Sequence, residues 1–512
     1  MGFFSNLSKV FSKNNFASEI KALEAIPSSQ RSSQEEVRLA FAYLRQAERC
    51  QTLKERKEQI KQALNLYLKH EEQLQNDVNW LFHVGVCYFL LEQELRSLPY
   101  FHKVLASCSD GQANQRFVQD AQAFINDATN KASAFLYAGT FLEHTKKAWS
   151  DFVKVEGKLR ELLQDSASSE LYDEAQTIFY TIFNPVIKNI EGNIYQNNGR
   201  YFIEFDNDLS VLKLFELNFI EACMPEELKQ NWQLNLGRAA PDPNSLIMMF
   251  EGEEIAVHEL YCYLVETNNG QFELNIFADK LLPILNSDPQ KVGSILSYAV
   301  SLQLGQMLTL RAIADITVSK EPLEEPCSCR LDKLYTYLMG KLSSNDLSFN
   351  EVLSTQLISY SFNADLDIIH NPRQGTVHGQ TYLKDLLSCY LENEDGKLYD
   401  LTDNGAVAVF LYFPIPQGQG QDQTNTQSLL LSLTKEIEQE HSHYYMTPIG
   451  QAHDLKYGYL DFIAWDLTLA LSIWRRVFKR RGLTTVYYQV YSAYSKSVDL
   501  ITGELVQDER SF

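Results

Sequence analysis

The chain has 512 residues, of which 45% are hydrophobic and 12% aromatic, and this supply of core-forming side chains excludes extended disorder. A chain of this length exceeds what one hydrophobic core usually organises, so two or three domains are expected. Lys and Arg total 45 against 66 Asp and Glu, and the formal net charge of −21 disfavours broad nucleic-acid binding because it repels phosphate backbones.

The N-terminal segment, residues 1–30, begins with a short amphipathic pattern. A helix over residues 2–13 would place four apolar side chains on one face: Phe3, Leu7, Val10 and Phe11. We favour a helix that docks on the helices that follow. The alternative is peripheral contact with a membrane surface, which would be the extent of any membrane association.

Residues 31–165 are predicted to form a helical domain, and residues 77–107 resemble one tetratricopeptide repeat (TPR). Gly85 and Ser97 lack bulk where two antiparallel helices would cross, and Phe101 would fill the groove between them. The flanking helices would complete the stack in degenerate form. A plain helical bundle is the alternative interpretation.

Such repeats bind partners and do not catalyse, so the repeat predicts a protein-binding groove. Exposed residues of that groove are the expected contacts to a protein or peptide partner: His83, Tyr100 and His102.

Residues 166–320 are predicted to form an α+β domain. Strands are expected over residues 201–205, 232–238 and 271–277, with helices over 209–222 and 291–311. Asn269 and Gly270 have the composition of a hairpin turn. A segment with two prolines and four charges, residues 319–326, reads as a linker that closes this domain.

Residues 330–512 are predicted to form a second α/β domain. It contains strands over residues 406–413 and 485–491, a polar loop over 416–428 and a long helix over 459–481. The expected fold class is therefore multidomain, with a TPR-like helical domain followed by two mixed α/β domains.

The order of segments over residues 140–480 resembles an uncharacterised family of bacterial cytoplasmic proteins that join TPR-like repeats to two α/β domains. Three stretches carry the resemblance: residues 223–232, 304–306 and 458–466. The resemblance brings no established chemistry. Because members resemble genes beside polymorphic-toxin systems, it implies an immunity or accessory role by analogy.

Alternating histidines form the candidate metal site of the chain. His441 and His443 could direct two imidazoles at one ion, with His453 ten residues further on as a third ligand. No acidic or thiol ligand completes a diagnostic spacing, so we favour a surface loop and expect no cofactor.

Two further stretches contain residue types that are common in binding sites. A loop with His370, Arg373 and His378 could hold an anion, although it lacks the order of a phosphate-binding loop. Cys327 and Cys329 could be a redox pair or half of a zinc site, but no second pair is recognisable in the sequence, and we favour an incidental linker motif.

The only strong basic run of this acidic chain lies at the end of the helix predicted over residues 459–481. It contains five cations: Arg475, Arg476, Lys479, Arg480 and Arg481. They would offset the negative end of the helix dipole and could pair with acidic residues of the same chain, which we favour over a site for nucleic acid or anionic lipid.

No catalytic fingerprint is present, so enzymatic activity is not expected. The absence of an apolar stretch near 18 residues, together with eight cysteines mostly set in apolar patterns, predicts a cytoplasmic protein with reduced thiols. The leading hypothesis is an interaction or scaffold protein that binds a partner through a TPR-like groove. The alternatives are an immunity protein that neutralises a basic toxin, and a metal-dependent enzyme that uses the three histidines.

Overall fold

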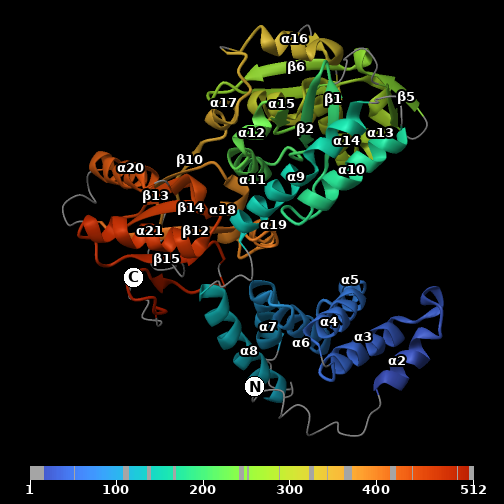
Figure 1. The fold of residues 1–512 in the computed structure, drawn as a ribbon, viewed down its shortest axis with the longest axis vertical. Coiled ribbons are helices and arrows are strands. Elements are labelled where there is room, and N and C mark those ends of the chain that lie inside the picture. The colour runs from blue at the N-terminus through green and yellow to red at the C-terminus, as the bar shows by residue number, and fades with distance from the viewer. Residues whose placement is uncertain are drawn as a thin grey trace.

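The computed structural model describes residues 16–506 apart from residues 51, 108–114, 135–139, 165–168, 241–246, 251–252, 288, 322–327, 343, 363–371, 416–422, 441 and 493. A helical N-terminal region is followed by regions that combine helices and sheets (Figure 1). This confirms the coarse fold class. The amphipathic segment expected over residues 2–13 lies outside the described residues.

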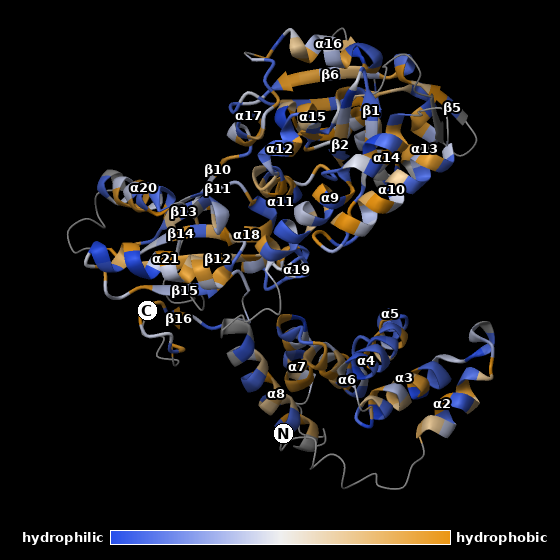
Figure 2. Cartoon of the chain, in the orientation of Figure 1, coloured by the Kyte–Doolittle hydropathy of each residue, from blue (hydrophilic) through white to orange (hydrophobic). Residues whose placement is uncertain are grey.

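The N-terminal region consists of helices that pack in chain order, α3 on α4, α6 on α7 and α7 on α8. Their bounds are α2 Phe16–Glu24, α3 Ser33–Ala47, α4 Leu53–Leu68, α5 Glu71–Leu74, α6 Val78–Leu90, α7 Glu94–Ser107 and α8 Gln115–Ala134, with a 3₁₀ turn at Ser28–Gln30. Polar and apolar residues occupy different sides of most of these helices (Figure 2), as expected for helices that bury one stripe.

Where α6 and α7 cross, Phe101 packs directly over Gly85. A Cβ atom at position 85 would lie 2.8 Å from Cε1 of the Phe101 ring. That ring is fully buried and stacks on Phe124 of α8 with 5.0 Å between centroids. The small residue and the large ring therefore meet as the spacing of residues 77–107 predicts.

The next region combines a three-stranded sheet with four helices. Its elements are α9 Phe141–Gln164, α10 Ser169–Phe183, β1 Gly192–Asn197, β2 Arg200–Phe205, α11 Val211–Ala222, α12 Glu226–Lys229 and β3 Trp232–Asn235. Strand β2 pairs with β1 antiparallel and with β3 parallel. Trp149 of α9 donates a hydrogen bond to the Ile220 carbonyl of α11 over 2.9 Å, so these two helices of the region pack together.

A four-stranded sheet, in the order β8-β7-β6-β9, has a buried cluster of its own that extends from Ile255 to Leu338. This part contains β4 Ile247–Phe250, β5 Glu253–Ala256, β6 Tyr261–Glu266, β7 Phe272–Phe277, α13 Leu282–Ser287, α14 Pro289–Leu304, α15 Gln306–Ala312, β8 Ile313–Val318, β9 Cys329–Arg330 and α16 Leu334–Met339. Strands β6 and β7 are joined by the Asn269 and Gly270 turn, where Gly270 has a φ of 78°. Strand β9 and helix α16 follow the expected linker but pack in this cluster.

The C-terminal region is built on a seven-stranded sheet in the order β10-β11-β13-β14-β12-β15-β16, with antiparallel pairing between the neighbours. Its elements are α17 Phe349–Ser354, β10 Ile358–Tyr360, β11 His378–Thr381, α18 Lys384–Leu391, α19 Gly396–Thr402, β12 Val407–Pro414, α20 Gln423–Gln439, β13 Met446–His453, β14 Tyr457–Ala464, α21 Leu467–Arg480, β15 Tyr487–Val490 and β16 Val498–Asp499. Strand β12 is buried along nearly its whole length.

The helix predicted over residues 459–481 is wrong in its first part. Residues up to Ala464 belong to β14, and α21 begins at Leu467. Asp466 separates the two elements, since its carboxylate caps α21 by accepting from the Leu469 N–H over 3.0 Å. Strand β14 is apolar and buried at nearly every position, whereas α21 buries only one face. Because β14 lacks the alternation that identifies a strand, periodicity did not separate it from the helix that follows.

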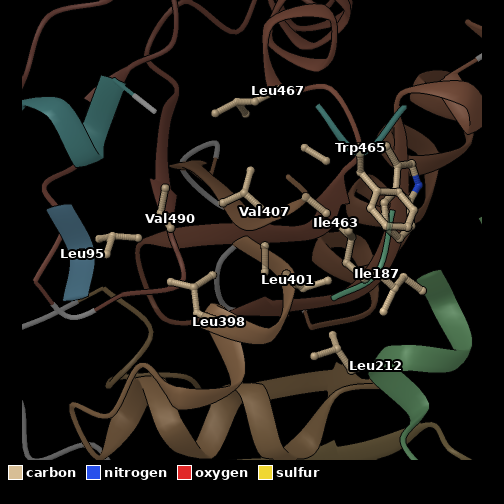
Figure 3. Packing of buried hydrophobic residues seen from close by; sticks show 14 of the residues in the cluster. Leu95, Ile187, Leu212, Leu398, Leu401, Val407, Ile463, Trp465, Leu467 and Val490 are labelled. Atoms are coloured by element: carbon tan, nitrogen blue, oxygen red, sulfur yellow. The ribbon is translucent and has the colours of Figure 1, made fainter. Parts of the chain in front are cut away.

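The N-terminal helices contact the C-terminal region directly, through helix α19 and the residue that follows it. The hydroxyl of Tyr399 in α19 donates to the Leu95 carbonyl of α7 over 3.2 Å, and Arg96 pairs with Asp403 at 2.8 Å. Figure 3 shows Leu95 in the same packed region as Leu398 of α19.

Candidate functional site

Helices α2, α3, α4 and α6 enclose a groove of about 680 Å³, which we call the N-terminal groove. Its volume lies within the range of about 300–1,000 Å³ that is usual for binding pockets. Six of the residues that line it are apolar or aromatic: Phe16, Val37, Phe41, Tyr67, Leu74 and Trp80. The polar residues that line it are Glu19, Ser33, Gln34, Arg38, Asp77, Asn79 and His83.

Capping interactions fix the helices that build the groove. Ser32 and Glu35 form a capping box at the start of α3, with the Ser32 N–H donating to Glu35 Oε2 over 2.8 Å. At the start of α6, Asp77 Oδ1 accepts from the Trp80 N–H over 2.8 Å. The Trp80 indole then donates to the Tyr67 carbonyl over 2.9 Å, so the wall between α4 and α6 is rigidly placed.

His83 supplies a hydrogen-bond acceptor to this aromatic wall. Its Nδ1 lies 2.7 Å from the Asn79 carbonyl oxygen. Because a carbonyl oxygen only accepts, Nδ1 carries the proton and Nε2 is the acceptor. The ring lies parallel to Tyr67 at 6.0 Å and meets Phe41 edge-on at 5.2 Å. Burial among these rings lowers the pKa of His83 to about 4, so the imidazole is neutral at neutral pH.

An ion pair crosses one side of the groove. Arg38 of α3 lies 2.9 Å from Glu19 of α2, and the arginine side chain is 66% exposed. Away from the groove, buried Glu36 lies 2.6 Å from both Lys69 and His70. The contacts of Glu36 with Lys69 and His70 join α3 to the end of α4. Arg38, by contrast, is exposed and accessible to a ligand.

Of the three predicted partner-binding residues, only His83 lines the groove. The Tyr100 ring lies 5.6 Å from Tyr88 and 5.9 Å from Trp80, and of these three residues only Trp80 lines the groove. His102 lies 5.3 Å from the Tyr494 ring of the C-terminal region. Tyr100 therefore packs among the N-terminal helices, and His102 contacts the C-terminal region.

Sequence reasoning missed the α3 contribution to the groove. Val37 and Phe41 are spaced i and i+4, so they occupy the same helical face. Leu39 and Tyr43, also spaced i and i+4, occupy a different and more buried face of the same helix. A second apolar stripe on one helix is the signal by which the groove could have been found.

The predicted ligand loop contains a buried arginine. His370 lies outside the described residues, whereas Arg373 is 0% exposed and pairs with Asp461 of β14, itself 0% exposed. The guanidinium also donates to the Tyr360 hydroxyl and lies 5.4–5.6 Å from the centroids of three rings, those of Phe410, Tyr459 and Tyr491. Arg373 thus anchors this part of the loop to the sheet through its ion pair with Asp461 of β14.

The two predicted metal ligands that the structure describes, His443 and His453, lie apart. His441 lies outside the described residues, and His443 is exposed before β13 whereas His453 ends that strand. Since a strand residue advances by about 3.4 Å, the eight residues of β13 separate these two histidines by roughly 25 Å. His453 instead faces His378 across the pairing of β11 with β13. The described part of the chain holds no group of three or more His, Cys, Asp or Glu arranged to bind a metal ion.

Glutamates in α20 and directly after it pair with the basic run at the end of α21. Arg480 lies 2.6 Å from Glu436 and 2.7 Å from Glu440, and Arg476 lies 3.0 Å from Glu440. Arg481 pairs with Glu436, while the Arg475 side chain donates to the Leu500 carbonyl over 2.6 Å. Lys479 is exposed. Most of the run is thus engaged within the chain.

Comparisons of the chain with protein-family models, with curated proteins and with solved structures find no match. Among the described residues, no helix combines the length and the apolar character needed to cross a membrane.

Proposed function

We propose that this chain is a protein-interaction protein whose N-terminal groove binds an apolar segment of a basic partner protein. Successive helices that pack in pairs, α3 with α4 and α6 with α7, support the proposal, because a TPR-like domain would present its groove beside such pairs. The observation that carries the proposal is the apolar and aromatic cavity of about 680 Å³ with polar groups beside it.

The lining favours an amphipathic helix as the bound segment. Its apolar side chains, spaced i and i+3 or i+4, would lie against Val37, Phe41 and Trp80, as in other helix-in-groove complexes. His83 Nε2 and the Asn79 amide would receive polar groups of the same segment. Aromatic walls of this kind commonly carry much of the energy of an interface.

Charge favours a basic partner. The net charge of −21 attracts cations and accelerates their encounter at low ionic strength. Lys or Arg residues that flank the apolar segment would therefore raise the association rate, and added salt would lower it.

The proposal is tested with a displayed library of amphipathic helical peptides selected on the full-length chain. Selected peptides are expected to carry apolar anchors with basic flanks. Val37→Glu places a carboxylate against the half-buried wall of the groove and is expected to weaken their binding by at least about tenfold, since burying an unpaired charge costs more than about 1.4 kcal/mol.

His102→Ala is the matched control, because His102 lies on α7 outside the groove. It is expected to leave the affinity unchanged. Equal binding of the selected peptides by the Val37→Glu variant, with its helical circular dichroism intact, would contradict the proposal.

An immunity function is the narrower form of the same idea, in which the basic partner is a toxin. The acidic net charge is the observation that favours it. A toxin gene directly beside the gene for this chain would support the immunity function, and its product should then bind the full-length chain but not the Val37→Glu variant. A gene with no such neighbour would count against it.

A further inference from the structure

Strands β6 and β9 place Cys262 and Cys329 directly opposite each other. The antiparallel register pairs Tyr261 with Arg330 and Cys262 with Cys329. Opposite residues in such a pair have Cα atoms about 4.5–5.5 Å apart and side chains on the same face. Since disulfides span Cα distances of about 4.4–6.8 Å, the backbone is already positioned to form one.

The two thiols contact each other but differ in access. Both side chains are thiols in this structure, and a hydrogen bond joins the two sulfurs. Cys262 is 0% exposed within the buried cluster of the four-stranded sheet, whereas Cys329 is half-buried. An oxidant can therefore reach Cys329 first, with Cys262 held behind it.

The contact also prepares Cys329 for reaction. The hydrogen bond from Cys262 lowers the pKa of Cys329, and this effect outweighs the opposing effects of burial and of the nearby Asp332 carboxylate. A lower pKa increases the fraction of thiolate, which is the nucleophilic form of cysteine.

We propose that Cys262 and Cys329 are a peroxide-reactive pair that forms a reversible disulfide between β6 and β9. In the first step the Cys329 thiolate attacks one oxygen of the peroxide, the O–O bond breaks, and the departing hydroxide or alkoxide takes up a proton to leave as water or alcohol, respectively. This step leaves a sulfenic acid on Cys329.

In the second step the Cys262 sulfur attacks the sulfenic sulfur and loses its proton, while the S–O bond breaks and water leaves. Overall the two thiols lose two electrons and two protons, and the peroxide is reduced. A dithiol reductant reverses the reaction by thiol–disulfide exchange.

The test uses the full-length chain and hydrogen peroxide. After brief exposure, remaining thiols are alkylated and the protein is digested without reduction for mass spectrometry. A peptide pair linked through Cys262 and Cys329 is expected, with the loss of two of the eight thiols and their recovery after dithiothreitol.

Two variants separate this pair from other cysteines. Cys389→Ser, at a half-buried thiol of α18, and Cys327→Ser are both expected to leave the cross-link intact. Cys262→Ser is expected to abolish it and to leave Cys329 as a sulfenic acid that dimedone traps. Cys329→Ser is expected to abolish the cross-link as well. If that variant does not fold, the dimedone adduct in Cys262→Ser still tests the proposal.

Two outcomes would overturn the proposal. One is recovery of Cys262 as an alkylated thiol at peroxide concentrations that already convert Cys329 to its sulfinic acid. The other is a cross-link between Cys329 and Cys327 in place of Cys262.

Discussion

At the scale of single residues, the crossing of α6 and α7 depends on the absence of a side chain at position 85. Gly85→Ala would place a methyl group 2.8 Å from the buried Phe101 ring. Overpacking of this kind costs about 1–3 kcal/mol, which exceeds the gain of up to about 1 kcal/mol from the higher helix propensity of alanine. We therefore expect a lower midpoint of urea unfolding, followed by circular dichroism.

Gly157→Ala is the matched control, because Gly157 lies within α9 and a Cβ there would have no atom within 4 Å. Only the propensity gain applies at this position, so a small stabilisation is expected. If both substitutions shift the midpoint in the same direction, close contact at Gly85 does not govern the crossing.

Arg373 and Asp461 make the loop after β10 depend on a single buried charge pair. Both side chains are 0% exposed. Asp461→Asn would leave the arginine charge buried without its counter-ion, which costs about 3–5 kcal/mol. The double variant Arg373→Met with Asp461→Leu removes both charges at similar volume and is expected to be less destabilised, as judged from urea midpoints. A double variant no more stable than the single one would show that the charge pair is not the main contribution.

At the scale of elements, the sequence predicted contacts within one short stretch better than contacts between elements that are distant in the chain. The two helices within residues 77–107 and the contact between Gly85 and Phe101 follow from spacing along one short stretch. The groove could not be predicted in the same way, because its walls combine Phe16, Tyr67 and His83 from three helices. Likewise, nothing in the sequence near Cys329 points to Cys262, which becomes its neighbour only through the pairing of β6 with β9.

The boundary between β14 and α21 shows why apolar patterns fail at buried elements. Residues 457–464 are buried on both faces at the centre of the sheet, so they lack the alternation that identifies a strand. The cap at Asp466 is the local signal that separates strand from helix. Asp466→Ala removes the acceptor for the Leu469 N–H and is expected to lower stability by about 1 kcal/mol, measured by urea unfolding.

Asp466→Asn serves as the companion substitution, since an asparagine side chain also caps helices well. It is expected to retain most of the stability. Equal losses for the alanine and asparagine variants would indicate that the negative charge, and not the capping hydrogen bond, stabilises the start of α21.

At the scale of the whole molecule, one buried hydrophobic cluster extends through the N-terminal helices, the region of the three-stranded sheet and the C-terminal region. Leu212 of α11 lies in the packed region of Figure 3 together with Leu398 and Leu401 of α19. Asn404, just after α19, donates to Glu216 of α11 over 2.8 Å and accepts from the Lys188 N–H over 2.9 Å. One side chain thus links three segments, and its partner Glu216 is only 3% exposed.

This buried glutamate makes the junction sensitive to pH. Burial raises the pKa of Glu216 from 4.5 to about 8, so the folded chain holds a proton at neutral pH that the unfolded chain has released. The resulting stabilisation is fully present below about pH 4.5 and is lost as the pH rises through about 8. Asp395, whose pKa burial raises to about 7, acts in the same direction.

Glu216→Gln keeps an acceptor for Asn404 but removes the titration, so it isolates this contribution from those of other groups. We expect thermal midpoints close to those of the parent chain at pH 5, and a midpoint several degrees higher than the parent at pH 8.5, because the parent alone must bury a carboxylate there.

Glu226→Gln, at a glutamate that is 87% exposed, is the control and should follow the parent profile throughout. Since Asn404 joins α11 to α19, a difference confined to high pH would mean that proton binding at this junction holds the middle and C-terminal regions together. Parallel profiles for the parent and Glu216→Gln would show that Glu216 contributes nothing to the pH dependence.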